Sequence, residues 1–202
     1  MKVLFAWLFL LQAIFQATNL FVQEGGKPMG IVLIAVGRID RQVMERLRDD
    51  LSTALNREVS LGKEMPEPDY AFHEKRNQYL STAILKILMK QKEYASCEKV
   101  LGIADHDLYV PELNFVFGEA GRKAAVISLT RLRQEFYGMP EDKHLFYRRA
   151  LTEAVHELGH TYGLSHCSNP GCVMFFSNSL PDTDRKGFEF CPGCKDKLLK
   201  SF

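Results

Sequence analysis

The sequence predicts an α/β domain with a largely parallel sheet, and three observations support this fold class. Apolar runs of strand length alternate along the chain with segments whose apolar residues recur at helical spacing. The 202 residues are enough for one compact domain with a substantial core. The alternation ends in a long helix, predicted over Lys143–Gly163, which carries apolar and ionisable residues on different sides.

The first half of the domain opens on a strand that follows the chain breakers Gly25, Gly26 and Pro28. The next segment has an apolar stripe at helical spacing that starts with Val43 and Met44. In order, the predicted elements are a buried strand over Gly30–Val36, a helix over Arg41–Leu55, a short strand over Glu58–Leu61 and an amphipathic helix that begins near Asn77.

Three further strands precede the long helix. They are predicted over Lys99–Ala104, Asn114–Phe117 and Ala124–Thr130, with a turn around Gly118 and Gly121. After the long helix the chain lacks apolar periodicity, so the sequence predicts a loop-rich tail that needs a cross-link to hold its shape.

The charge balance excludes one class of partner. Lys and Arg number 26 against 25 Asp and Glu, which gives a net charge of +1. No basic stripe stands out, and this argues against a nucleic-acid-binding protein.

The most informative motif lies at the end of the long helix. His156 and His160 are four residues apart, so both imidazoles project from one helix face and can bind one ion. Gly163 lets the chain leave the helix at positive φ, and His166 can then return as a third ligand. Three imidazoles leave one position of a tetrahedral Zn²⁺ for water, which is the arrangement of a catalytic site. Glu157 would act on that water as general base.

Four of the five cysteines crowd the last fifth of the chain. Cys167 and Cys172 form one closely spaced pair and Cys191 and Cys194 form another, which predicts a structural zinc site with four thiolates. Two disulfides are the alternative if the protein is exported. Cys97 stands apart and is expected to be a small apolar residue of the interior.

The first 28 residues are predicted to be an extension outside the domain. Residues 1–22 are mostly apolar, but the uninterrupted run Val3–Leu11 is too short to span a bilayer, so no stable membrane insertion is expected. A signal peptide cleaved after Ala17 would place Phe15 where a small residue is needed. A reduced thiolate site favours a cytoplasmic protein that starts near Met29, with export through residues 1–22 as the alternative.

The motif H-E-x-x-H-x-x-G-x-x-H followed by a methionine in a turn resembles the metzincin clan of zinc proteases. The cysteines that follow it at once make the chain similar to one family of that clan, archaemetzincin. Other segments that look like this family are Asn114–Ala120, Ser177-Asn178 and Asp184-Arg185-Lys186. The resemblance runs from about Met29 to the carboxyl terminus.

The resemblance implies a single metalloprotease domain over residues 29–202 with a mixed, mostly parallel sheet, an active-site helix and a four-cysteine subsite over residues 167–194. It implies two zinc ions: a catalytic one held within residues 156–166 by His156, His160 and His166, and a structural one held by Cys167, Cys172, Cys191 and Cys194. Glu157 would be the proton acceptor, Met174 would lie beneath the catalytic metal, and Asn114–Phe117 would be an edge strand that binds the backbone of a peptide or protein substrate. We expect a monomer.

Two other hypotheses stay open on the residues alone. One is a zinc-stabilised binding or regulatory protein whose protease-like site is silent. The other is a purely structural two-zinc scaffold, which needs Asp182, Asp184 or His144 as a fourth ligand beside the histidines. Because His166 and Cys167 share a peptide bond, we also expect the structural zinc to fix where His166 points.

Overall fold

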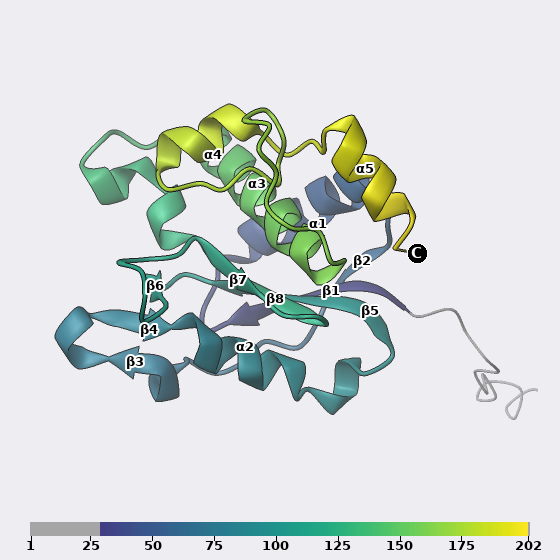
Figure 1. Ribbon diagram of the computed structural model, residues 1–202. Helices are drawn as coiled ribbons and strands as arrows, with labels where there is room; N and C mark the ends of the chain where they lie inside the picture. Colours follow the sequence, from purple (N-terminus) through teal and green to yellow (C-terminus); the bar gives the residue numbers. More distant parts are fainter. Residues whose placement is uncertain (1–28, 202) are drawn as a thin grey trace, which may run out of the picture.

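The computed structural model describes residues 29–201, which form a five-stranded sheet with helices on both faces and a smaller three-stranded sheet beside it (Figure 1). The predictions for residues 1–28 lie outside the described residues. Within the part of the chain that the structure describes, no helix is long and apolar enough to cross a membrane.

The main sheet is mixed and mostly parallel, which confirms the predicted fold class. Its strand order is β2 (Val59–Leu61), β1 (Met29–Val36), β5 (Cys97–Ala104), β8 (Ala124–Ser128) and β7 (Gly118–Ala120). β1 and β5 pair in parallel along their whole length. β7 runs antiparallel to β8 and forms the edge of this sheet.

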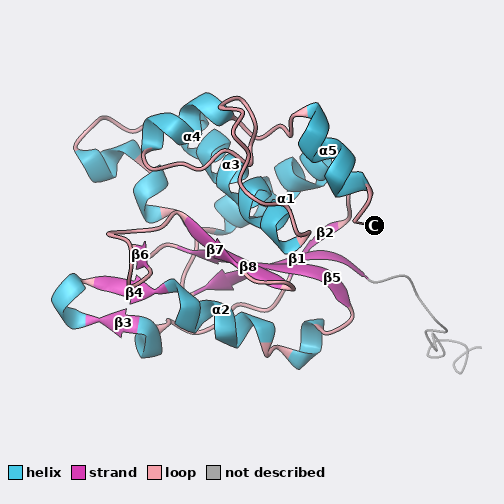
Figure 2. Ribbon diagram, viewed as in Figure 1, coloured by secondary structure: helices cyan, strands magenta, loops and turns pink. Residues whose placement is uncertain are grey.

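Helices cover the two faces of the sheet, and the alternation of β1 shows how the core is divided. Ile31 and Leu33 point to one face and pack with residues of α1 (Arg41–Leu55) and α3 (Lys143–Thr161). Val32 and Ile34 point to the other face and pack with α2 (Ser81–Met89). This is the period of two that a strand buried on both faces requires. Figure 2 shows α3 and α2 on opposite sides of the sheet.

The second helix begins later than predicted. Its expected first turn is instead β4 (Gln78–Leu80), which pairs with β3 (Phe72–His73) and β6 (Leu108–Tyr109) in the small sheet. Asn77 is in the left-handed region at φ 51°, which a continuing α-helix does not allow. Within the described residues, short 3₁₀ turns lie at Asp69–Ala71, Glu74–Arg76, Lys92–Tyr94, Thr130–Leu132 and Gln134–Tyr137.

The predicted strand Asn114–Phe117 is wrong, and the edge strand is β7, where the sequence predicted a turn. The Arg76 guanidinium donates to the backbone carbonyls of Leu113 and Asn114 at 2.9 and 3.0 Å, so these carbonyls bond a side chain instead of a neighbouring strand. Val116 makes only an isolated bridge to Leu108. Regular pairing begins at Gly118, opposite Ile127.

The prediction of a loop-rich tail is also wrong in part, because two short helices lie there, α4 (Leu180–Lys186) and α5 (Pro192–Leu199). Each has about two turns, which is too short for an apolar period to be visible in the sequence. α4 packs against α3, where the Arg149 guanidinium binds the Asp184 carboxylate with two bonds of 2.7 Å. Tertiary contacts therefore stabilise this short helix.

Candidate active site and metal centres

The helix α3 carries the histidine motif into the centre of the molecule. Its start is fixed by Asp142, whose carboxylate accepts from the Leu145 backbone N–H at 2.9 Å. Its end is followed by Gly163 at φ 87°, as the sequence predicted. His156 and Glu157 are buried in the last turns of the helix, whereas His166 returns from the loop and is exposed.

The three histidines meet as predicted, with one ring nitrogen from each within 4.8 Å of the others. His156 Nδ1 lies 2.6 Å from the Val173 carbonyl, and His160 Nδ1 lies 2.8 Å from the Leu164 carbonyl. A carbonyl only accepts, so each Nδ1 carries the proton and each Nε2 has a free lone pair. The two Nε2 atoms are 3.1 Å apart. This donor set fits a zinc ion, whose bonds to imidazole nitrogen are about 2.0–2.1 Å long.

The electrostatics of the site keep the imidazoles neutral. Burial lowers the pKa of His156, His160 and His166, and the nearby Lys186 ammonium adds to the effect at His156. Burial also raises the pKa of Glu157 well above its ordinary value, and the neighbouring Glu153 carboxylate acts in the same direction. Neutral imidazoles are the form that binds metal, and a nearby cation would favour the ionised Glu157.

None of the three proposed fourth ligands lies with the histidines. Among the described residues, the group at this point that could hold an ion contains only His156, His160 and His166. The Asp184 carboxylate binds Arg149, and the Asp182 carboxylate accepts from Ser179 at 2.8 Å. The arrangement therefore leaves the cleft side of the triad open, which argues against the purely structural scaffold.

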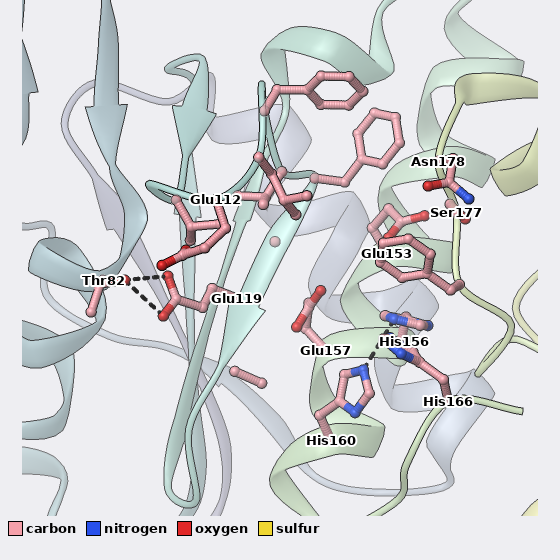
Figure 3. A pocket seen from close by; sticks show the side chains of 18 of the residues that line it. Thr82, Glu112, Glu119, Glu153, His156, Glu157, His160, His166, Ser177 and Asn178 are labelled. Atoms are coloured by element: carbon pink, nitrogen blue, oxygen red, sulfur yellow. Dashed lines mark hydrogen bonds between the residues drawn. The ribbon is translucent and has the colours of Figure 1, made fainter.

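A cleft of about 570 Å³ separates the triad from the edge strand β7. Figure 3 shows Glu157 between the histidines and the opposite wall, which carries Thr82, Glu112 and Glu119. The Glu119 carboxylate is fixed by the Thr82 hydroxyl, 2.9 Å from both of its oxygens. The cleft thus has the triad and Glu157 on one side and a sheet edge on the other.

Two glycines let neighbouring parts of the chain approach the site closely. A Cβ at Gly118 would lie 2.5 Å from Glu157 Cγ, so only glycine lets the edge strand approach this carboxylate. A Cβ at Gly159 would lie 2.5 Å from Met174 Sδ. Met174 is fully buried against the motif helix at this point, which supports the expectation that it lies beneath the histidines.

The four cysteines of the tail also meet, with their sulfur atoms within 4.8 Å of one another. Cys167 Sγ lies 3.9 Å from Cys191 Sγ, close to the roughly 3.8 Å expected between two thiolates at 2.3 Å on a tetrahedral zinc. All five cysteines of the chain are free, and Cys97 is buried as expected. The geometry favours a thiolate site over two disulfides.

The fold and this site together define a class of protein, the metallopeptidases in which one helix carries two histidines and a glutamate and the following loop carries a third histidine. Residues 20–200 match the sequence profile of Peptidase family M54, a match that starts upstream of Met29. The chain belongs to this family, the archaemetzincins.

Individual relatives agree with this assignment. Archaemetzincin from Pyrococcus horikoshii is 50% identical over 134 residues, which are 65% of this chain and 71% of that protein. The crystal structure of archaemetzincin from Methanopyrus kandleri is similar with a TM-score of 0.75 and 38% identity, covering 88% of this chain and 97% of that one. A zinc-dependent peptidase from Methanocorpusculum labreanum is similar with a TM-score of 0.75 and 34% identity, covering 84% and 100%.

Sequence reasoning missed several residues of the site. The sequence predicts a turn at Gly118 and indicates no role for Glu119, Glu153 or Lys186. The adjacent Gly118-Glu119 and the Asp184-Arg185-Lys186 segment both belong to stretches that resemble the family, and this was the available signal.

Proposed function

We propose that this metallopeptidase hydrolyses peptide bonds with a zinc-activated water and with Glu157 as general base. The observation that carries the proposal is the position of Glu157, which is buried beside the histidine triad, lines the cleft and packs against Gly118 of the edge strand. A silent binding protein would not need an ionisable group enclosed at this point, because burying a carboxylate opposes folding.

Two zinc ions are proposed for each chain. His156, His160 and His166 hold the catalytic ion, since one ring nitrogen from each converges on the same point and the cleft side stays open. The structural ion is held by the remaining cluster, made of Cys167, Cys172, Cys191 and Cys194. The N–H of Cys194, in the first turn of α5, lowers the pKa of the Cys191 thiol to about 7, which favours the thiolate that zinc binds.

The geometry supports the following catalytic roles. Held by the three histidines, a zinc ion would lower the pKa of a water toward about 7 and polarise the substrate carbonyl. Glu157 accepts the proton of this water and later transfers it to the leaving amine. Glu157 is buried and packs against Gly118, so its carboxylate needs little reorganisation during the reaction.

The substrate backbone is proposed to bind along the free edge of β7. Ser128 donates to the Phe117 carbonyl and Gly121 donates to the Ala124 carbonyl, both at 2.8 Å. Antiparallel pairing alternates, so Gly118 and Ala120 direct their backbone N–H and C=O groups away from β8 and toward the cleft. A peptide strand added here would bind through backbone groups common to all sequences.

Digestion of a peptide library by the zinc-loaded protein, with Glu157→Gln beside it, tests the proposal. We expect the variant to keep both zinc ions and to lose about 10²–10⁴-fold in turnover, the usual contribution of a general base. Glu141→Gln, an exposed position before α3, is the matched control and should behave as the wild type. Retained turnover in a zinc-loaded Glu157→Gln protein would exclude Glu157 as the base. Inactivity of the wild type on every peptide would favour the binding protein.

A further inference from the structure

Lys186 and Glu153 form a buried ion pair beside the histidine triad, and neither residue belongs to the histidine cluster or the cysteine cluster. Lys186 Nζ is 3.2 Å from Glu153 Oε1, and the two side chains are 0% and 3% exposed. Glu153 lies on α3 one turn before Glu157, and Lys186 is the last residue of α4. The Thr183 hydroxyl donates to the same Glu153 oxygen at 2.8 Å.

The Lys186 ammonium joins three parts of the site. Besides Glu153, it donates to the Phe175 carbonyl at 3.3 Å and lies 3.3 Å from His156 Nδ1. The proton of His156 Nδ1 is already donated to the Val173 carbonyl. The segment 173–175 is therefore held at one end by the His156 imidazole and at the other by Lys186.

Helix packing alone does not explain this pair. Arg149 and Asp184 already join α3 to α4 with two bonds of 2.7 Å. A second ion pair, fully enclosed, adds little stability, because the desolvation of both charges offsets their attraction. The two pairs differ in position: Lys186 touches His156 and the carbonyl of Phe175, whereas Arg149 lies one turn before Glu153 on α3 and bonds the Leu132 carbonyl.

We propose that Lys186, paired with Glu153, is a positioning residue that sets the orientation of the His156 imidazole through the segment 173–175. It acts by fixing the carbonyl of Phe175, which keeps the Val173 carbonyl in line with His156 Nδ1. Partners of this kind fix the ring and tautomer of a ligand histidine, and losing one costs about 10–100-fold in metal affinity. The inference rests on the proposed binding of zinc by the triad, and it is independent of whether the protein hydrolyses peptides.

The test is zinc affinity of the full chain, measured by competition with a chelator. The double variant Glu153→Gln/Lys186→Met removes both charges together, so the net charge beside the triad is unchanged. Its matched control is Arg149→Met/Asp184→Asn, which removes the other pair between the same helices. The absorption spectrum of the Co²⁺-substituted protein distinguishes the two metal sites, because cobalt–thiolate bands arise only from the cysteine site.

We expect zinc at the histidines to bind about 10–100-fold more weakly in the first double variant and within about twofold of wild type in the control. Equal losses in both variants would show a general effect of helix packing and overturn the proposal, as would wild-type affinity in the first. If the double variant does not fold, Thr183→Val replaces it: this change keeps both charges and removes the hydroxyl that holds Glu153. About fivefold weaker binding is then expected, and unchanged affinity overturns the proposal. A wild type that binds no zinc at the histidines contradicts the proposed function instead.

Discussion

Gly118→Ala should disable the enzyme through a single methyl group. The added Cβ would lie 2.5 Å from Glu157 Cγ and 2.7 Å from Glu157 Oε1, against 3.4–4 Å for ordinary contact. One of the two elements must therefore move by about 1 Å. Glu157 is buried on α3 and already packs against Gly118, so the added methyl group pushes the carboxylate and the edge strand apart.

A displacement of about 1 Å in a catalytic group can cost about 10²-fold in rate. We expect kcat/KM to fall by this factor. Both zinc ions should stay bound, because the three atoms nearest to the new methyl group all belong to Glu157, which is not a metal ligand. Steady-state peptide hydrolysis and zinc content per chain are the measurements. Gly121→Ala is the matched control in the same hairpin, since the nearest atom to its Cβ would be Met89 Sδ at 3.1 Å, on a flexible side chain, and the next contacts lie at an ordinary 3.6 and 3.8 Å. Turnover of zinc-loaded Gly118→Ala within about threefold of wild type would refute the close approach of β7 and Glu157.

Three further predictions concern the edge, the metals and pH. Ala120→Pro removes a backbone N–H that faces the cleft and leaves the β7–β8 hydrogen bonds intact. We expect KM to rise several-fold with little change in melting temperature. An unchanged KM would exclude substrate binding at this edge. Cys167→Ser should lose the structural zinc and also weaken zinc at the histidines about tenfold, because His166 is the adjacent residue; unchanged affinity at the histidines, measured by chelator competition, means that the sites are independent. Glu157→Gln should stabilise the metal-free protein. Burial raises the pKa of Glu157 in the folded state, so the folded protein binds more protons and the wild type loses stability as pH rises above the ordinary value of 4.5. The melting temperature of the variant should exceed that of the wild type more at pH 8 than at pH 5, and an equal difference would contradict the assignment of this shift.

The sequence alone was sufficient where a short range of residues carries the whole signal. The helix over Arg41–Leu55 has the predicted bounds because its apolar stripe faces the core without interruption. The spacing of His156 and His160 depends only on the pitch of an α-helix, so their convergence followed from the sequence. The four-cysteine cluster followed in the same way from two closely spaced pairs.

Tertiary structure decided the features that depend on contacts between distant residues. The edge strand lies at Gly118–Ala120 because Arg76 engages the carbonyls before it and Glu157 needs the space at Gly118. Lys186 meets Glu153 and His156 across 33 and 30 residues, a contact that no local pattern indicates. Helix pitch and short spacings are encoded locally, whereas the packing of a glycine against a carboxylate exists only after the sheet and α3 have come together.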